Sequence, residues 1–174
     1  MKPSILELDR MRYKGTNPPI FQKYFRKTQC ANNPVSKVIY KTLFWITKNM
    51  RGIEISDETE IGPGLYICHA YCITINEKSK LGSNINIHKG ATIAQENRGI
   101  RKGAPSIGNR VWIGINSTIV GKITIGDDVM IAPNTFINCD VPSHSIVFGN
   151  PCIIKHKENA VEGYINNIIV DENE

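Results

Sequence analysis

The sequence has neither a long hydrophobic run nor a paired cysteine motif. No apolar stretch in its 174 residues approaches the roughly 18–20 residues needed to cross a bilayer. Its five cysteines are an odd number and include no CxxC pair, which argues against a disulfide framework and against a zinc ribbon. The N-terminus lacks the charged, apolar and small-residue order of a signal peptide. We therefore expect one cytoplasmic folding unit with reduced thiols.

Acidic residues are scarce in the N-terminal third of the chain. Residues 1–52 contain 11 lysines and arginines against two acidic residues, whereas residues 53–174 contain 10 against 14. Prolines divide this part into short helices or irregular arms, and the best helical apolar spacing runs from about Pro34 to Met50. Either this helix docks against the rest of the protein or a neighbouring subunit, or it contacts a membrane surface peripherally through the basic arm. We expect no nucleic-acid partner.

Isoleucine recurs every six residues in the second half of the sequence. A helix repeats near 3.6 residues and a half-buried strand near two, so this period indicates short strands separated by regular corners. Such strands stack on the coil above and form a mainly β fold, a parallel β-helix with hexapeptide repeats. The repeating positions are Ile107, Ile113, Ile119, Ile125, Ile131 and Ile137.

The repeat is less regular before Ile107. It begins near Ile55 and shifts by two residues between Ile73 and Ile75, which predicts a bulge near residues 71–74. From Ile93 to Ile107 the interval is too long for one hexad, so residues 94–106 are expected to leave the coil as an exposed functional loop.

These boundaries predict three parts. We expect a basic, partly helical N-terminal arm at 1–52, a β-helix domain at 53–152, and a C-terminal cap or tail at 153–174. Within the last part, residues 160–170 are expected to form a short strand or helix that covers the open end of the stack.

Three segments carry a family resemblance: GIEI at 52–55, CHA at 68–70 and DVPSHSIVFGNP at 140–151. With them, residues 52–155 resemble the left-handed β-helix acyltransferases, most closely the serine acetyltransferase family and its relatives in surface-polysaccharide gene sets. The resemblance implies a left-handed coil and a homotrimer with active sites between subunits. It also implies acetyl-CoA as co-substrate, with acetyl transfer to a hydroxyl of L-serine or of a surface-polysaccharide sugar.

The same resemblance places the catalytic base at His69 and its orienting carboxylate at Glu54. Neutral imidazole suits the removal of a hydroxyl proton during attack on a thioester. The family has aspartate both before the histidine and in the orienting position, whereas this chain has Cys68 and Glu54. Glu54 precedes His69 by less than one coil, so the two can lie near one corner.

The acceptor and the co-substrate have further candidate residues. His88 is expected within one position of His69 in the coil above, where it lines the acceptor pocket. The family's Arg-His-Pro is replaced by Gly103-Ala104-Pro105, which weakens the case for free serine. The basic loop residues that meet a carboxylate or sugar phosphate instead are Arg98, Arg101 and Lys102. The candidates for binding acetyl-CoA are Gly114, Ala132, Pro133 and Lys155 or Lys157, with backbone oxyanion donors near Ala94 or Gln95.

Two other functions fit the repeat. One is a noncatalytic β-helix that serves as a scaffold or binding protein. The other is a metalloenzyme like the γ-class carbonic anhydrases, which hold zinc with three histidines drawn from two subunits. Of the four histidines here, His144 and His156 lie in or beyond the terminal coil, so no metal is expected. The choice between serine and sugar, and the acyl chain length, stay open.

Overall fold

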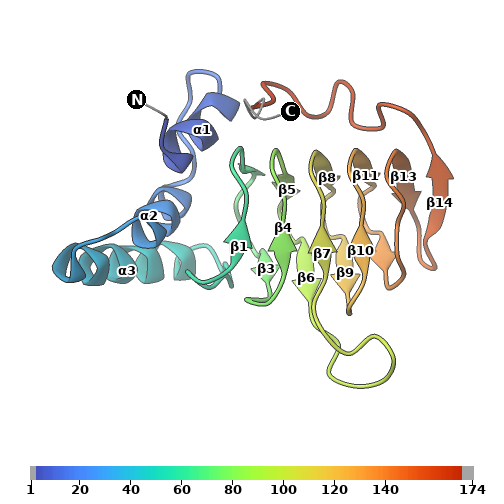
Figure 1. The fold of residues 1–174 in the computed structure, drawn as a ribbon, viewed down its shortest axis with the longest axis horizontal. Coiled ribbons are helices and arrows are strands. Elements are labelled where there is room, and N and C mark those ends of the chain that lie inside the picture. The colour runs from blue at the N-terminus through green and yellow to red at the C-terminus, as the bar shows by residue number, and fades with distance from the viewer. Residues whose placement is uncertain (1–2, 170–174) are drawn as a thin grey trace.

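Three helices precede a stack of short strands wound as a prism (Figure 1). The computed structural model describes residues 3–169. The helices are α1 (Ile5–Arg12), α2 (Ile20–Gln29) and α3 (Pro34–Asn49). The strands are β1 (Glu60–Ile61), β2 (Tyr66–Cys68), β3 (Thr74–Ile75), β4 (Lys80–Leu81), β5 (Asn86–His88), β6 (Thr92–Ala94), β7 (Ser106–Ile107), β8 (Val111–Ile113), β9 (Thr118–Val120), β10 (Thr124–Ile125), β11 (Val129–Ile131), β12 (Phe136–Ile137), β13 (Ser145–Phe148) and β14 (Ile153–His156).

Successive strands go to three different sheets, which form the faces of the prism. One sheet has the order β1-β4-β7-β10, another β2-β5-β8-β11-β13-β14, and the third β3-β6-β9-β12. Among the strands of residues 3–169, neighbouring pairs along the coil are parallel, and β13 and β14 pair antiparallel. The predicted fold, a left-handed parallel β-helix of hexapeptide repeats with a partly helical N-terminal arm, is confirmed.

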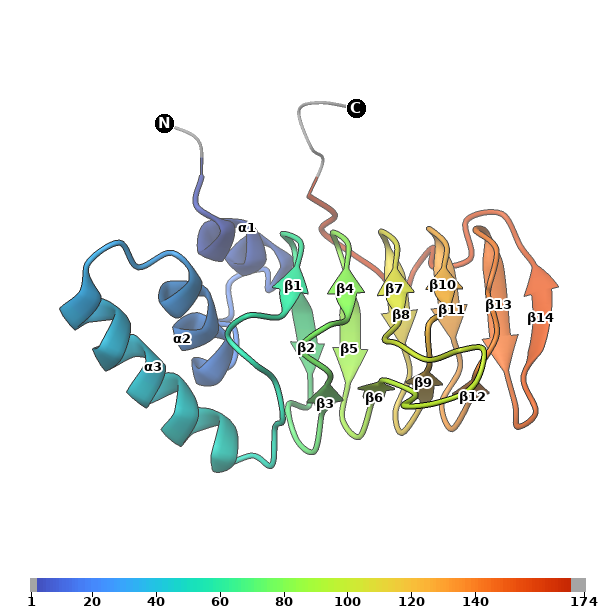
Figure 2. The same cartoon turned by 60° about the horizontal axis from the view of Figure 1, so that its bottom comes forward.

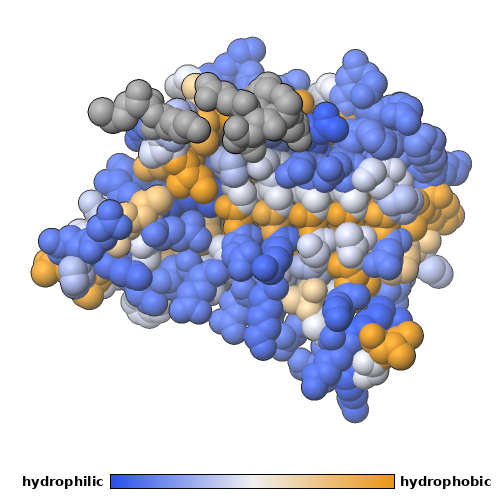
Figure 3. Space-filling model, viewed as in Figure 1, coloured by the Kyte–Doolittle hydropathy of each residue, from blue (hydrophilic) through white to orange (hydrophobic). Residues whose placement is uncertain are grey.

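The isoleucines of the repeat fill the interior. Ile113 pairs with Ile131 and Ile119 with Ile137, so equivalent positions are 18 residues apart, as three hexads per coil require. All six repeating isoleucines are buried. Figure 3 shows the consequence on one face, a largely hydrophilic surface crossed by a narrow hydrophobic band along the prism.

The irregular first half has one enlarged corner. Ile67 pairs with Ile87, 20 residues away, whereas Ile75 pairs with Ile93, 18 residues away. Two extra residues therefore lie between β2 and β3, as the shift in the repeat predicted. His69 and Cys72 bound this corner with positive φ angles of 51° and 52°, a backbone conformation in which side chains other than glycine are uncommon.

The chain between β6 and β7 leaves the prism as a loop (Figure 1). Glu96 and Gly103 form an antiparallel bridge at its base. The guanidinium of Arg101 lies 3.0 Å from the Glu96 carboxylate. These contacts hold the base of the loop in a defined hairpin.

A buried ion pair joins the helices to the first coil. Arg26 Nε lies 2.8 Å from Asp9 Oδ2, and both side chains are completely buried. Arg26 also donates to the carbonyl oxygens of Ile61 and Gly62, and Asp9 accepts from the backbone N–H of Leu65. Part of the N-terminal basic surplus is therefore structural and never reaches the surface.

Residues 157–169, here called the C-terminal strap, run back along the prism toward α1 (Figure 1). They form turns and bends, so the expectation that residues 160–169 form a closing strand or helix is wrong, and residue 170 lies outside the described part. The β13–β14 hairpin closes that end instead. Arg12 holds the strap, because its guanidinium donates to Asn166, Gly64 and Asn86. Burial lowers the pKa of Arg12 to about 10.

Breaking the buried pair is expected to destabilise the fold strongly. Arg26→Ala leaves the Asp9 carboxylate buried without its cation, so the free energy of unfolding should fall by about 3–5 kcal/mol in denaturant titrations. Lys80→Ala is the matched control, since it breaks the exposed Lys80–Glu60 pair and should cost at most about 1 kcal/mol. Equal losses in the two variants would contradict the role assigned to Asp9 and Arg26.

Candidate functional site

Two histidines from adjacent coils lie at the edge of the six-stranded sheet. Cys68 at the end of β2 pairs with His88 at the end of β5. His69 directly follows Cys68, so it stands one position beyond the residue beside His88, as the sequence predicted. Burial lowers the pKa of His88, and the charge of His69 adds to this effect.

His88 is held in a defined orientation. Its Nδ1 lies 3.0 Å from the carbonyl oxygen of Ile113. A carbonyl oxygen only accepts, so Nδ1 carries the proton and Nε2 keeps a free lone pair. Burial is the main cause that lowers the pKa of His88, partly offset by this hydrogen bond, and the ring is therefore neutral at physiological pH. The Trp112 ring packs beside it at a centroid distance of 4.5 Å.

His69 and Glu54 are both exposed and lie on different sides of the enlarged corner. Glu54 bridges Thr74 at the start of the sheet that contains β3, with its backbone bonded to Ile73 and Ile75. Within residues 3–169 no hydrogen bond or ion pair joins the Glu54 carboxylate to the His69 ring. The two candidates share a corner without direct contact, and the dyad stays a prediction.

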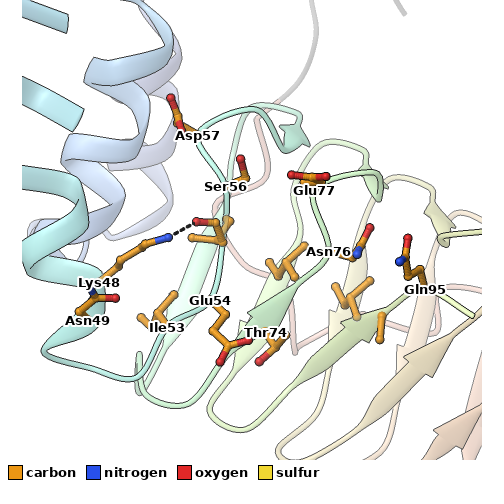
Figure 4. A pocket seen from close by; sticks show the side chains of 14 residues that line it. Lys48, Asn49, Ile53, Glu54, Ser56, Asp57, Thr74, Asn76, Glu77 and Gln95 are labelled. Carbon is orange, nitrogen blue, oxygen red and sulfur yellow. Dashed lines mark hydrogen bonds between the residues drawn. The ribbon is translucent and has the colours of Figure 1, made fainter. Parts of the chain in front are cut away.

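Glu54 instead lines a groove of about 510 Å³ (Figure 4). Two other predicted residues, Ala94 and Gln95, border the same groove at the root of the loop. Figure 4 shows Glu54 beside Thr74 and shows Lys48 reaching the Ile55 carbonyl, to which its Nζ donates at 2.7 Å. The structure thus brings the proposed orienter and the proposed oxyanion donors to one place.

Lys48 is a groove residue that the sequence analysis missed. It belongs to α3, and burial lowers the pKa of its ammonium group. Because Lys48 belongs to a helix outside the hexapeptide repeat, the spacing of the repeat could not predict its position beside Glu54. Asp57, Asn76 and Glu77 also line this groove and were not predicted.

Gly114 and Ala132 lie in a row beyond His88. They directly follow Ile113 and Ile131, which pair with each other, while His88 follows Ile87, the partner of Ile113. We call Gly114 and Ala132 the small-residue lane. A Cβ at Gly114 would lie 2.6 Å from the Ile131 carbonyl oxygen, so coil packing already requires glycine there.

The remaining candidates for co-substrate binding lie around this lane. Pro133 is exposed in the corner after Ala132. Lys155 lies on β14, with its ammonium group 5.7 Å from the centroid of the Phe148 ring. Lys155 therefore stands near the end of the lane that is remote from His88.

The three basic loop residues differ in whether their side chains already form an ion pair. Arg101 is paired with Glu96 at the base of the loop, so its guanidinium is already engaged. Arg98 and Lys102 are exposed on the loop. Of the three basic residues, these two extend into solvent and form no salt bridge with a described residue.

Metal ligands are not gathered in the described part of the chain. Across residues 3–169 no group of three or more His, Cys, Asp or Glu side chains has an arrangement suited to a metal ion. His144 lies at the closing end of the prism, where its Nδ1 is 2.9 Å from Asp128 and 3.3 Å from Glu158. His156 lies near the same Glu158.

Comparison with known proteins identifies relatives of this chain. The family described as "Bacterial transferase hexapeptide (six repeats)" matches residues 104–139. A serine acetyltransferase of Helicobacter pylori is 33% identical over 112 residues, which are 64% of this chain and 66% of the relative. A relative of the same name from Staphylococcus xylosus is 33% identical over 66% of this chain and 53% of its own length. The chain thus spans about two thirds or less of the length of these curated relatives.

A solved structure agrees with them. Serine acetyltransferase of Neisseria gonorrhoeae in complex with serine superposes with a TM-score of 0.71 at 26% identity, covering 87% of this chain and 67% of that one. From its repeats, its wound fold and these relatives, the chain belongs to the hexapeptide-repeat, left-handed β-helix family and resembles the serine acetyltransferases within it.

Proposed function

We propose that the protein is an acetyl-CoA-dependent O-acetyltransferase that acts by direct attack of an acceptor hydroxyl on the thioester. The relatives named serine acetyltransferase support the reaction class. The observation that carries the proposal is the pair His69 and His88 in adjacent coils, next to the small-residue lane. An imidazole can take the proton of the acceptor hydroxyl, and the small side chains of the lane leave room for a pantetheine arm.

In this mechanism the His69 imidazole takes the hydroxyl proton as the acceptor oxygen attacks the acetyl carbonyl. Glu54 orients the ring and stabilises the imidazolium that forms, after a side-chain adjustment that brings the two into contact. A backbone N–H near Ala94 or Gln95 donates to the developing oxyanion. The proton then goes from His69 to the departing thiolate, which leaves as coenzyme A.

The acceptor is either L-serine or a sugar hydroxyl, and different observations favour each. The names of the relatives and the serine in the Neisseria complex favour serine. The surroundings of His88 favour a sugar, because Trp112 lies beside His88 and the Tyr164 ring meets Trp112 edge-on at 5.4 Å. Aromatic rings of this kind offer apolar faces for the C–H surface of a pyranose.

The assembly belongs to the same proposal. We place the active sites between subunits of a homotrimer, where Arg98 and Lys102 of the loop meet the acceptor and Lys155 meets the nucleotide phosphates of acetyl-CoA. Use of acetyl-CoA places the reaction in the cytoplasm, with peripheral membrane contact through the basic N-terminal arm. Among the described residues, no helix is long and apolar enough to span a membrane.

Removing the proposed base is the direct test. In a free-thiol assay with acetyl-CoA and a panel of serine and nucleotide-sugar acceptors, His69→Ala should lower turnover by roughly 10²–10⁴-fold, because the acceptor proton then has no base. His156→Ala is the matched control and should keep wild-type turnover, since that exposed ring lies at the closing end. Unchanged turnover in His69→Ala would refute the mechanism.

The orienting role of Glu54 makes a smaller prediction. Glu54→Gln keeps the shape of the side chain and removes its charge, so kcat should fall by roughly tenfold or more while KM for acetyl-CoA stays near its wild-type value. Glu60→Gln, an exposed carboxylate on β1, serves as control. If both variants keep the wild-type kcat, Glu54 has no part in the reaction.

His88 should act on acceptor binding rather than on chemistry. His88→Gln is expected to raise KM for the acceptor several-fold with a smaller change in kcat, because it removes the oriented Nε2 from the pocket. Steady-state kinetics at fixed acetyl-CoA measures this split. A loss confined to kcat would move His88 from the acceptor pocket to the reacting atoms.

A further inference from the structure

Arg12 is a buried cation without a carboxylate partner in the described part of the chain. Its side chain is 3% exposed, and no acidic residue of 3–169 lies within salt-bridge distance of it. Arg26, buried in the same arm, has Asp9 at 2.8 Å. Asp9 favours the charged form of Arg12 as well, but its carboxylate is already bonded to Arg26. The positive charge of Arg12 is therefore left over, and a buried charge without compensation costs free energy.

The hydrogen bonds of Arg12 orient the guanidinium without neutralising it. Nε donates to the Asn166 carbonyl, Nη1 to the Gly64 carbonyl and to Oδ1 of Asn84, and Nη2 to Oδ1 of Asn86. All these acceptors are neutral oxygens. A guanidinium has five N–H donors, so one N–H of Nη2 has no acceptor among residues 3–169.

A pocket of about 210 Å³ opens beside this guanidinium. Figures 1 and 2 show where it lies, with α1 and the end of the C-terminal strap on the same side of the prism, beside the first coils. Lys14 lines the pocket with Arg12 and brings a second positive charge on an exposed side chain. The rings of Tyr66 and Tyr164 also line it, and none of its described lining residues is acidic. The pocket is therefore cationic and has aromatic walls.

This cationic pocket lies next to His88. Asn86, which lines it, and His88 are alternate residues of β5 with the buried Ile87 between them, so both side chains project from the outer face, about 7 Å apart along the strand. Trp112 pairs with Asn86 in the next coil. Its ring lies 4.5 Å from the ring of His88 and 5.4 Å from that of Tyr164, measured between centroids. One molecule can therefore cross Trp112 and reach both places.

We propose that the cationic pocket binds the anionic group, a carboxylate or a phosphate, of an acidic acceptor sugar. The unused N–H of Arg12 and the Lys14 ammonium meet the anionic oxygens. The rings of Tyr66 and Tyr164 flank the sugar that carries the group. The assignment of this sugar as the acceptor rests on the proposed function, whereas the binding of the anion does not. The pocket is formed by the arm, the first coils and the strap, so it is a different site from the loop with Arg98 and Lys102.

Calorimetric titration of the full chain, without acetyl-CoA, tests the pocket. The probes are glucuronate and glucose 1-phosphate, with glucose as the neutral match. At least one anionic sugar should bind roughly tenfold or more tighter than glucose, with an affinity that falls as salt is raised. The tighter of the two identifies the anionic group. Lys14→Gln should weaken its binding roughly fivefold or more, because one of the two charges is lost.

Lys78→Gln is the matched control, since Lys78 is an exposed lysine between β3 and β4 that does not line the pocket. It should bind like wild type, and thermal melts should show both variants folded. Equal affinity for glucose and the two anionic sugars, or wild-type affinity in Lys14→Gln, would overturn the proposal. Loss of binding in Lys102→Gln but not in Lys14→Gln would assign the anion to the loop and equally overturn it.

Turnover separates this site from the proposed function. Binding needs no reaction, so a protein that binds the acidic sugar in this pocket but transfers no acetyl group refutes the proposed function alone. With turnover, Lys14→Gln should raise KM for the acidic acceptor several-fold and leave kcat near its wild-type value. An unchanged KM in an active Lys14→Gln variant would overturn the role of the pocket in acceptor binding.

Discussion

The stacking of one coil on the next is the constraint on which the rest of the structure depends. Each short strand bonds to the strand one coil away, and this register holds only if the isoleucines stay aligned inside. Outward residues are then fixed in rows along the prism. The placement of His88 in line with Gly114 and Ala132 is a direct result of this alignment.

The same constraint explains how much of the molecule could be predicted from its sequence. Wherever the period of six is kept, as from Ile107 to Ile137, the positions of strands and interior residues follow from counting. The sequence predicted where the enlarged corner lies but not its backbone conformation, because the spacing of the repeat does not indicate the positive φ angles of His69 and Cys72. The path of the C-terminal strap could not be predicted, since it depends on Arg12, which contacts Asn86 and Asn166 across long sequence separations.

For the same reason, only part of the candidate site could be predicted from the sequence. Register alone predicted the neighbourhood of His69 and His88, because both belong to the coil. It could not show that the Ile113 carbonyl fixes the His88 ring, since a side-chain bond of this kind depends on a rotamer. Nor could it show that Glu54 shares a groove with Lys48, because the position of α3 is set by the packing of Phe44 on Phe25.

The enlarged corner lies between the two surfaces that the proposed mechanism uses. The small-residue lane lies on the sheet that contains β8 and β11, whereas the groove with Glu54 lies on the sheet that contains β3. The two surfaces meet at the corner that begins with His69. This corner contains two residues more than a regular hexad. The proposed mechanism requires His69 to be exposed at this corner, because the base has to lie between the sheet with His88 and the lane on one side and the groove with Glu54, Ala94 and Gln95 on the other.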